Sequence, residues 1–115
     1  MNIQIYCLKR NFDVQKAERF FKERRVPYQV VDLKKHQLGG KELALFARKA
    51  GSAAALLGAS PEVRSHPVAY TDDEAYILDA IREHPQFLRT PIVRNGDQVT
   101  VGADEEKWSQ WLSAK

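Results

Sequence analysis

Cys7 is the only thiol in the chain and therefore the first candidate for redox or nucleophilic chemistry. The reactive form of a cysteine is the thiolate, which neighbouring positive charges favour. Lys9 and Arg10 follow Cys7 closely, so a Cys7 side chain that faced the same pocket as these cations would be activated. The alternative is a small buried side chain at the end of a strand, the usual environment of a free cysteine. The sequence leaves both interpretations open.

Three arginines, Arg10, Arg89 and Arg94, are candidates for binding an anion or a carboxylate, because the planar guanidinium matches the geometry of such oxygens. As isolated charges they would be ordinary surface residues. A single cysteine excludes an internal disulfide and a multi-cysteine metal site. The histidines are far apart in the sequence and lack ligand spacing, so we expect no metal site; they are His36, His66 and His84.

The N-terminal third predicts a strand, a helix and a second strand. Apolar and polar residues alternate from Ile3, and the strand continues to Leu8. Asn11 or Asp13 can cap the following helix, which ends before Pro27. Residues 28–33 are rich in β-forming side chains and predict the second strand. A helical crossover of this length makes the two strands parallel and the connection right-handed.

The middle of the chain predicts helices. Apolar residues at helical spacing follow Gly39 and end at Gly51, and Ser52 can cap a short helix over 53–57. Residues 59–70 contain two prolines and have no clear period, so we interpret them as a loop. The run 71–74 resembles a capping box that starts another helix, which ends near His84.

The C-terminal part predicts a hairpin and a final helix. Residues 91–94 and 98–101 are short apolar runs with an Asn95-Gly96 turn signal between them. The last helix begins near Asp104 and buries Trp108 and Trp111. The order is βαβ, a helical insertion, then ββα. It predicts an α/β, thioredoxin-like fold with a central mixed four-stranded sheet, in a single domain over residues 1–115.

The stretches 5–17 and 84–93, together with 95–97 and 101–102, resemble the arsenate reductase (ArsC)/Spx family in order and spacing. The family has a reactive cysteine at the start of its first helix, and counting back from Lys16-Ala17 places Asn11 at that position. The resemblance implies a cis bond before Pro91, facing the first helix. In this fold, extended peptides dock on the backbone beside that proline.

The chain departs from the family pattern at each group that arsenate chemistry would use. Asn11 has no thiol, and Thr90 stands where one oxyanion-binding arginine is expected. The other two arginine positions correspond best to Gly58 and Gly102. The resemblance therefore implies a redox site that has lost its function, with Arg10, Arg89, Thr90 and Pro91 as its remaining pocket residues.

Our leading hypothesis is a non-enzymatic protein that binds a protein partner. Spx-type relatives bind RNA polymerase, so a transcriptional partner is one possibility that the resemblance alone implies. The competing hypothesis is a thiol-dependent oxidoreductase that uses Cys7 and glutathione; otherwise we expect no cofactor. The net charge of +3 arises from interleaved acidic and basic residues, so we expect no direct nucleic-acid binding. The absence of an apolar run that could serve as a signal peptide or membrane span predicts a cytoplasmic protein.

Overall fold

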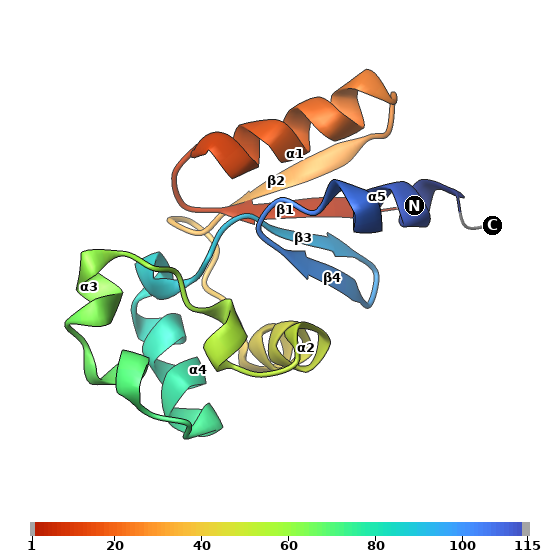
Figure 1. Ribbon diagram of the computed structural model, residues 1–115. Helices are drawn as coiled ribbons and strands as arrows, with labels where there is room; N and C mark the ends of the chain where they lie inside the picture. The colour runs from red at the N-terminus through yellow and green to blue at the C-terminus, as the bar shows by residue number, and fades with distance from the viewer. Residues whose placement is uncertain (1, 114–115) are drawn as a thin grey trace. The chain divides into compact units, whose positions relative to one another are not determined.

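The computed structural model describes residues 2–113, and its elements follow the predicted order (Figure 1). The strands are β1 (Ile3–Cys7), β2 (Tyr28–Asp32), β3 (Ile92–Asn95) and β4 (Gln98–Val101). The α-helices are α1 (Phe12–Glu23), α2 (Gly40–Ala50), α3 (Pro61–Arg64), α4 (Glu74–Glu83) and α5 (Glu105–Ser113). Short 3-10 helices are η1 (Ala54–Leu56), η2 (Pro67–Tyr70) and η3 (Pro85–Phe87).

The four strands form one mixed sheet in the order β2-β1-β3-β4. β1 pairs with β2 in parallel, while β1 with β3 and β3 with β4 are antiparallel. Ile5 at the centre of β1 lies opposite Val30 on one side and Val93 on the other. The predicted thioredoxin-like α/β architecture, βαβ followed by a helical insertion and ββα, is therefore confirmed.

The chain divides into two compact units, and each is described by itself. The sheet unit comprises the residues up to Asp32 together with those from Thr90 onward. Its core lies on the sheet face that carries Ile3, Ile5 and Val93, because paired residues in neighbouring strands share a face. Side chains of α1 and α5 complete this core: Ala17, Phe20, Phe21, Trp108 and Trp111.

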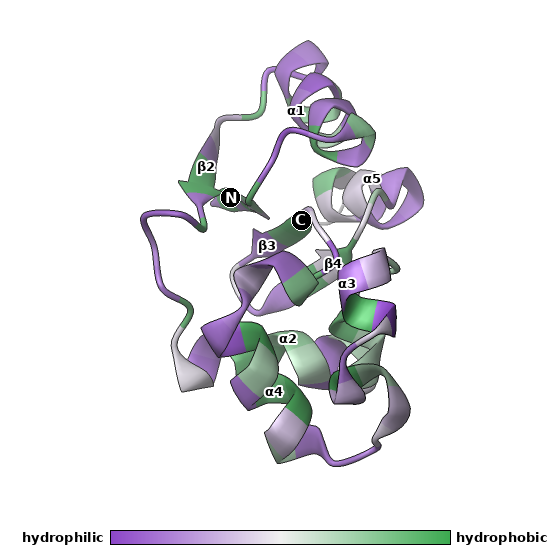
Figure 2. Ribbon diagram, turned by 90° about the vertical axis from the view of Figure 1, so that its left-hand side faces the viewer, coloured by the Kyte–Doolittle hydropathy of each residue, from purple (hydrophilic) through white to green (hydrophobic). Residues whose placement is uncertain are grey.

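The helical unit comprises Leu33–Arg89. α2 and α4 pack against each other in it, and Figure 2 shows hydrophobic residues gathered on these two helices. The fully buried side chains of the two helices repeat at helical spacing, which is the reason that the sequence pattern located them; they are Leu43, Phe46, Ile77 and Ile81. In the chain that the structure describes, no helix has the length and apolarity of a membrane span.

The segment 59–70 is not the loop that its prolines suggested. Ser60 accepts a hydrogen bond from the backbone N–H of Val63 and starts α3, and His66 caps η2 through the N–H of Val68. In each case a proline follows the cap directly. Proline suits the first helical position because its missing N–H needs no partner there, so both prolines begin short helices.

Two local predictions were wrong in detail. The cap of α4 is Asp73, whose side chain accepts a hydrogen bond from the backbone N–H of Tyr76. The Glu74 carboxylate accepts a hydrogen bond of 2.9 Å from the backbone N–H of Ala53 instead, so the predicted capping box does not form. In the hairpin, Asn95 pairs with Gln98 as the last residue of β3. The turn is therefore Gly96-Asp97, and Gly96 has the positive φ of 63° that the first loop position requires.

Candidate functional site at the start of the first helix

Asn11 is the N-cap of α1. Its backbone is extended, and its side-chain Oδ1 accepts a hydrogen bond of 2.8 Å from the backbone N–H of Val14. This bond satisfies one of the free amides of the first turn. Of the two capping residues predicted from the sequence, Asn11 is therefore the correct one, and Asp13 lies inside the first turn of the helix.

The Thr90–Pro91 peptide bond lies beside this cap, and it is cis, as predicted. The Asn11 side-chain amide donates to the Thr90 carbonyl at 3.3 Å and to its hydroxyl at 3.2 Å. On the other side of the loop, the N–H of Gly102 donates to the Pro91 carbonyl at 2.8 Å. Asn11 thus uses both ends of its amide to join the start of α1 to the proline loop.

Arg10 is the residue before this cap, and it forms an ion pair with Glu18, which lies eight residues later in the chain, on α1. The Arg10 side chain is 61% exposed, whereas that of Glu18 is only 13% exposed. The guanidinium charge nearest the helix start is therefore partly neutralised by a carboxylate of the same unit. An anion bound there would have to compete with Glu18 for Arg10.

The other two arginines are not brought to this cap within the sheet unit. Arg94 pairs with Gln4 near the beginning of β1, whereas α1 starts after the opposite end of that strand. The Nε of Arg94 donates to the Gly96 carbonyl at 2.7 Å. Arg89 is the last residue of the helical unit, where its N–H donates to the Leu56 carbonyl.

Two glycines stand where the resemblance implied arginines, and they differ in what they allow. In the helical unit, a Cβ at Gly58 would meet the Phe87 carbonyl at 3.6 Å and the Arg89 backbone at 3.9 Å, which are ordinary contacts, so a Cβ would fit there. Gly102 has a φ of 75°, a conformation that residues with a side chain rarely adopt. The backbone of the hairpin end is therefore shaped for glycine.

The Cys7 side chain lies on the inner face of the sheet. It shares the face of Ile3 and Ile5, the one that α1 covers, and only 6% of it is exposed. Burial raises the pKa of the Cys7 thiol above its ordinary value. Arg10 opposes this rise in pKa, whereas the carboxylates of Glu18 and Asp32 add to it. The activation by Lys9 and Arg10 that the sequence suggested is therefore outweighed.

We expect iodoacetamide to alkylate Cys7 slowly in the folded protein at neutral pH. Because the pKa of the thiol is raised, the rate should keep increasing above about pH 8.5, where ordinary thiols are half ionised. Because the pKa of Cys7 is higher in the folded than in the unfolded protein, the protonated thiol contributes to folding stability at pH values below the pKa of the unfolded state. This contribution is lost as the pH rises through the pKa of the folded state. The measurement is the alkylation rate against pH by mass spectrometry.

The urea-unfolded chain is the control, since its Cys7 is solvated and should titrate normally. A folded-state rate that reached its plateau below the pH of the unfolded-state plateau would contradict the buried, high-pKa thiol.

The helical unit holds an aromatic cluster that the sequence did not reveal. The rings of His66 and His84 lie 6.0 Å apart, and each lies 4.9 Å from the ring of Phe87. His66 uses its Nδ1 to cap η2. Among the described residues, no group of three or more His, Cys, Asp or Glu side chains could hold a metal ion.

Comparison with known proteins bears on the family resemblance. The ArsC family matches residues 67–111. No curated protein matches the chain. An arsenate reductase from Vibrio cholerae has a similar structure with a TM-score of 0.81 at 18% identity, over 96% of this chain and 97% of the other. An arsenate reductase (ArsC) related protein from Brucella melitensis has a TM-score of 0.72 at 21% identity, over 99% and 97%.

At these identities the structural likeness establishes the fold, while the family match covers the segment from η2 to α5. That segment contains the cis-proline loop and the hairpin on which much of the predicted resemblance rested. The resemblance is confirmed: the C-terminal part of this chain matches the ArsC family, and the chain has the fold of arsenate reductase and its related proteins.

Proposed function

We propose that this chain is a non-catalytic, ArsC-related protein of the cytoplasm that acts by binding another protein. The observation that carries the proposal is the role of Asn11. It stands where the resemblance places a reactive cysteine, and both ends of its amide are engaged, one with Val14 and the other with Thr90. An amide in this position has no nucleophilic or redox chemistry, and its contacts are structural.

The oxyanion positions support the same proposal. Thr90 accepts a hydrogen bond from Asn11 through its hydroxyl and carries no positive charge. Gly102 has a backbone conformation unsuited to an arginine. Arsenate carries negative charge on its oxygens and needs cationic donors that face it. Within the sheet unit, Arg10 is the cation next to the cap, and it is paired with Glu18.

The second candidate function is a reductase that uses Cys7 with glutathione as the reductant. Cys7 would have to present a thiolate to a substrate in solution, yet its side chain is buried beneath α1 and its pKa is raised. A low-pKa, accessible thiolate is the common requirement of such enzymes. The environment of Cys7 therefore favours the binding function over the reductase.

We expect the purified protein to show no arsenate reduction with glutathione or thioredoxin above the rate without protein. The physical reason is the absence of an accessible thiolate beside oxyanion-binding arginines. The measurement is coupled NADPH oxidation, with a Cys7→Ser variant in parallel. Turnover by the wild type that disappears in Cys7→Ser would make Cys7 the nucleophile and replace this proposal with the reductase.

Partner binding is tested by affinity purification from the source cytoplasm with mass spectrometry. RNA polymerase is the partner that the resemblance to Spx suggests, and purified polymerase should be tried directly. A specific complex formed equally by wild type and Cys7→Ser would support binding without thiol chemistry. A complex lost in Cys7→Ser would instead tie binding to the thiol and contradict the proposal.

A further inference from the structure

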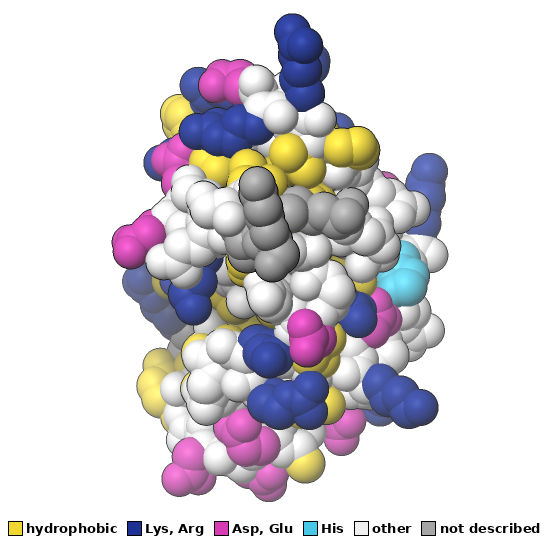
Figure 3. All heavy atoms as spheres, turned by 90° about the vertical axis from the view of Figure 1, so that its right-hand side faces the viewer, with side chains coloured by type: hydrophobic (Ala, Val, Ile, Leu, Met, Phe, Trp, Pro, Cys, Tyr) yellow, Lys and Arg dark blue, Asp and Glu magenta, His cyan; other side chains and the backbone are white. Residues whose placement is uncertain are grey.

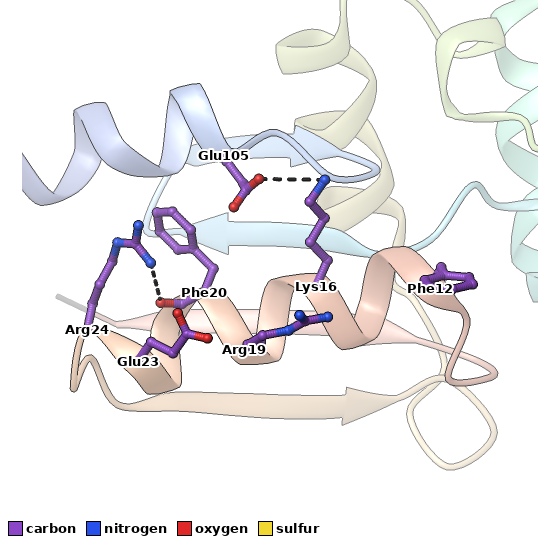
Figure 4. A pocket seen from close by; sticks show the side chains of 7 residues that line it. All are labelled: Phe12, Lys16, Arg19, Phe20, Glu23, Arg24 and Glu105. Carbon is purple, nitrogen blue, oxygen red and sulfur yellow. Dashed lines mark hydrogen bonds and ion pairs between the residues drawn. The ribbon is translucent and has the colours of Figure 1, made fainter.

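A groove runs along the sheet unit between α1 and the start of α5, which we call the α1–α5 groove. Its volume is about 390 Å³, within the range of roughly 300–1,000 Å³ typical of binding pockets. Figure 4 shows its side chains: five come from α1, Arg24 is the C-cap residue of that helix, and Glu105 begins α5. The lining residues are Phe12, Lys16, Arg19, Phe20, Glu23, Arg24 and Glu105.

At the end of the groove near the C-terminus of α1, the Arg24 guanidinium lies against a buried aromatic ring. Phe20 is 3% exposed, and the guanidinium lies over its ring, 3.7 Å from the centroid. Arg24 also donates to the Phe20 carbonyl at 3.1 Å. Ring contact and hydrogen bond together hold the guanidinium in one orientation, with part of its positive charge still available to a ligand.

Phe12 lies at the opposite end of α1 from Arg24 (Figure 4). Its side chain is 85% exposed, the largest exposed fraction among the large hydrophobic residues that the structure describes as exposed. A phenylalanine in water gains free energy when a partner covers it. The groove therefore has an exposed apolar anchor point near the Asn11 cap, while Phe20 at the other end is buried beneath Arg24.

The charged side chains between these two ends differ in whether they form an ion pair. Lys16 forms an ion pair of 3.5 Å with Glu105, in which both side chains are about half exposed. Arg19 lies in the middle of the groove and forms no ion pair with any residue that the structure describes. Glu23 lies one turn after Arg19 on the same helix. An incoming carboxylate would find its best free partner at Arg19.

We propose that the α1–α5 groove binds an acidic segment of the protein partner, whose carboxylate pairs with Arg19 while an apolar side chain packs against Phe12. This inference rests on the proposed function. The three cations of the groove, against two carboxylates, favour an acidic occupant over a basic one. The same carboxylates, Glu23 and Glu105, would repel the unbroken phosphate charge of a nucleic acid.

The composition of the groove agrees with a peptide rather than a polyphosphate, because its three cations are accompanied by two carboxylates. Figure 3 shows one face of the molecule, on which basic and acidic side chains are likewise interspersed. A protein segment can place single carboxylates beside the cations of the groove and avoid contact with Glu23 and Glu105. Specificity would then come from the match of charges along α1, and the apolar contact at Phe12 would add affinity.

The test selects peptides from a random linear library displayed on phage against the wild-type protein. We expect the enriched sequences to combine Asp or Glu with an aromatic or aliphatic residue. A fluorescein-labelled synthetic copy of the best peptide is then titrated by anisotropy. Reversal of the central charge, Arg19→Glu, should weaken its binding by about tenfold or more, because attraction becomes repulsion. Phe12→Ala should weaken it by a factor of about three or more, through lost apolar burial.

Lys22→Glu is the matched control. It makes the same change in net charge on the same helix, at an exposed residue that does not line the groove. Its affinity should stay within about threefold of wild type, since exposed charges away from the contact act weakly. Circular dichroism and the thermal midpoint verify that each variant is folded. A second check replaces the acidic residues of the peptide with their amides, which should abolish the effect of Arg19→Glu.

Several results would overturn the proposal: no enriched peptide, enrichment without acidic residues, or equal binding by Arg19→Glu and wild type. Binding of labelled duplex or single-stranded DNA that depends on Arg19 would assign the groove to nucleic acid instead. Concentration-dependent dimerisation lost in Arg19→Glu would assign it to a second copy of the chain. A partner captured from cytoplasm that still binds Arg19→Glu would refute the groove while leaving the proposed function standing.

Discussion

Replacing Asn11 with cysteine, in a chain whose Cys7 is changed to serine, is expected to create a thiol at least about tenfold more reactive than Cys7 at neutral pH. The new thiol would lie at the exposed N-cap of α1, where free amides and the helix dipole stabilise a thiolate. Its pKa should fall below the ordinary value of about 8.5, and each unit is about a tenfold gain in thiolate at neutral pH. Burial moves the pKa of Cys7 in the opposite direction.

The measurement is the rate of iodoacetamide alkylation against pH for each single-thiol variant. Gln15→Cys, also in the Cys7→Ser background, is the matched control, because it places an exposed thiol on the same helix beyond the first turn. The loss of the Asn11 cap costs only about 1 kcal/mol, so the protein should still fold. If the thiol at position 11 titrated like that at position 15, the helix start would lack the electrostatics of a thiol site.

Replacing Trp108 with alanine is expected to lower the free energy of unfolding by about 3–5 kcal/mol, a large part of the roughly 5–15 kcal/mol that a domain has. The side chain is fully buried in the core of the sheet unit. Its ring centroid lies 5.3 Å from that of Phe20 and 5.5 Å from that of Phe21. The indole N–H donates to the Thr100 hydroxyl at 2.8 Å, so the substitution removes both packing and a buried hydrogen bond.

Urea denaturation followed by circular dichroism measures the loss. Thr100→Val separates the two contributions, because it keeps the ring but leaves the indole N–H without its partner, at a cost of about 1–3 kcal/mol. Ser109→Ala, at an exposed position of the same helix, should change stability by less than about 0.5 kcal/mol. A loss below about 1 kcal/mol for Trp108→Ala would contradict its position at the centre of the core.

The elements of this fold were predictable where one local rule decided them. Ile3 and Ile5 alternate with polar residues and form the central strand, and the spacing of Phe20 and Phe21 placed the buried side of α1. The rules failed where a distant residue intervened. Glu74 would have completed a capping box, but its carboxylate accepts from Ala53 instead, since a backbone N–H far away in sequence offers a competing donor.

The candidate site was predictable in its backbone and not in its electrostatics. Asn11 was one of two capping residues that the sequence offered, and the resemblance implied the cis bond before Pro91; the structure has Asn11 as the cap and the cis bond. The ion pair of Arg10 with Glu18 was missed because the sequence does not state which charges meet when they are eight residues apart. The groove was missed for a similar reason: Glu105 joins Lys16 only through the packing of α5 beside α1.

The sequence by itself determined the order of the elements, the two candidates for the cap of α1 and the absence of a thiol at either of them. These are properties of residue type and local spacing, which act over a few residues and need no knowledge of the rest of the chain. The tertiary structure alone decided the state of Cys7 and the neighbourhood of His66 and His84. Solvation and pairing depend on which distant groups surround a side chain. Burial outweighs the effect of Arg10 on the pKa of Cys7, and the packing of η2 against α4 brings together His66, at the start of η2, and His84, at the end of α4.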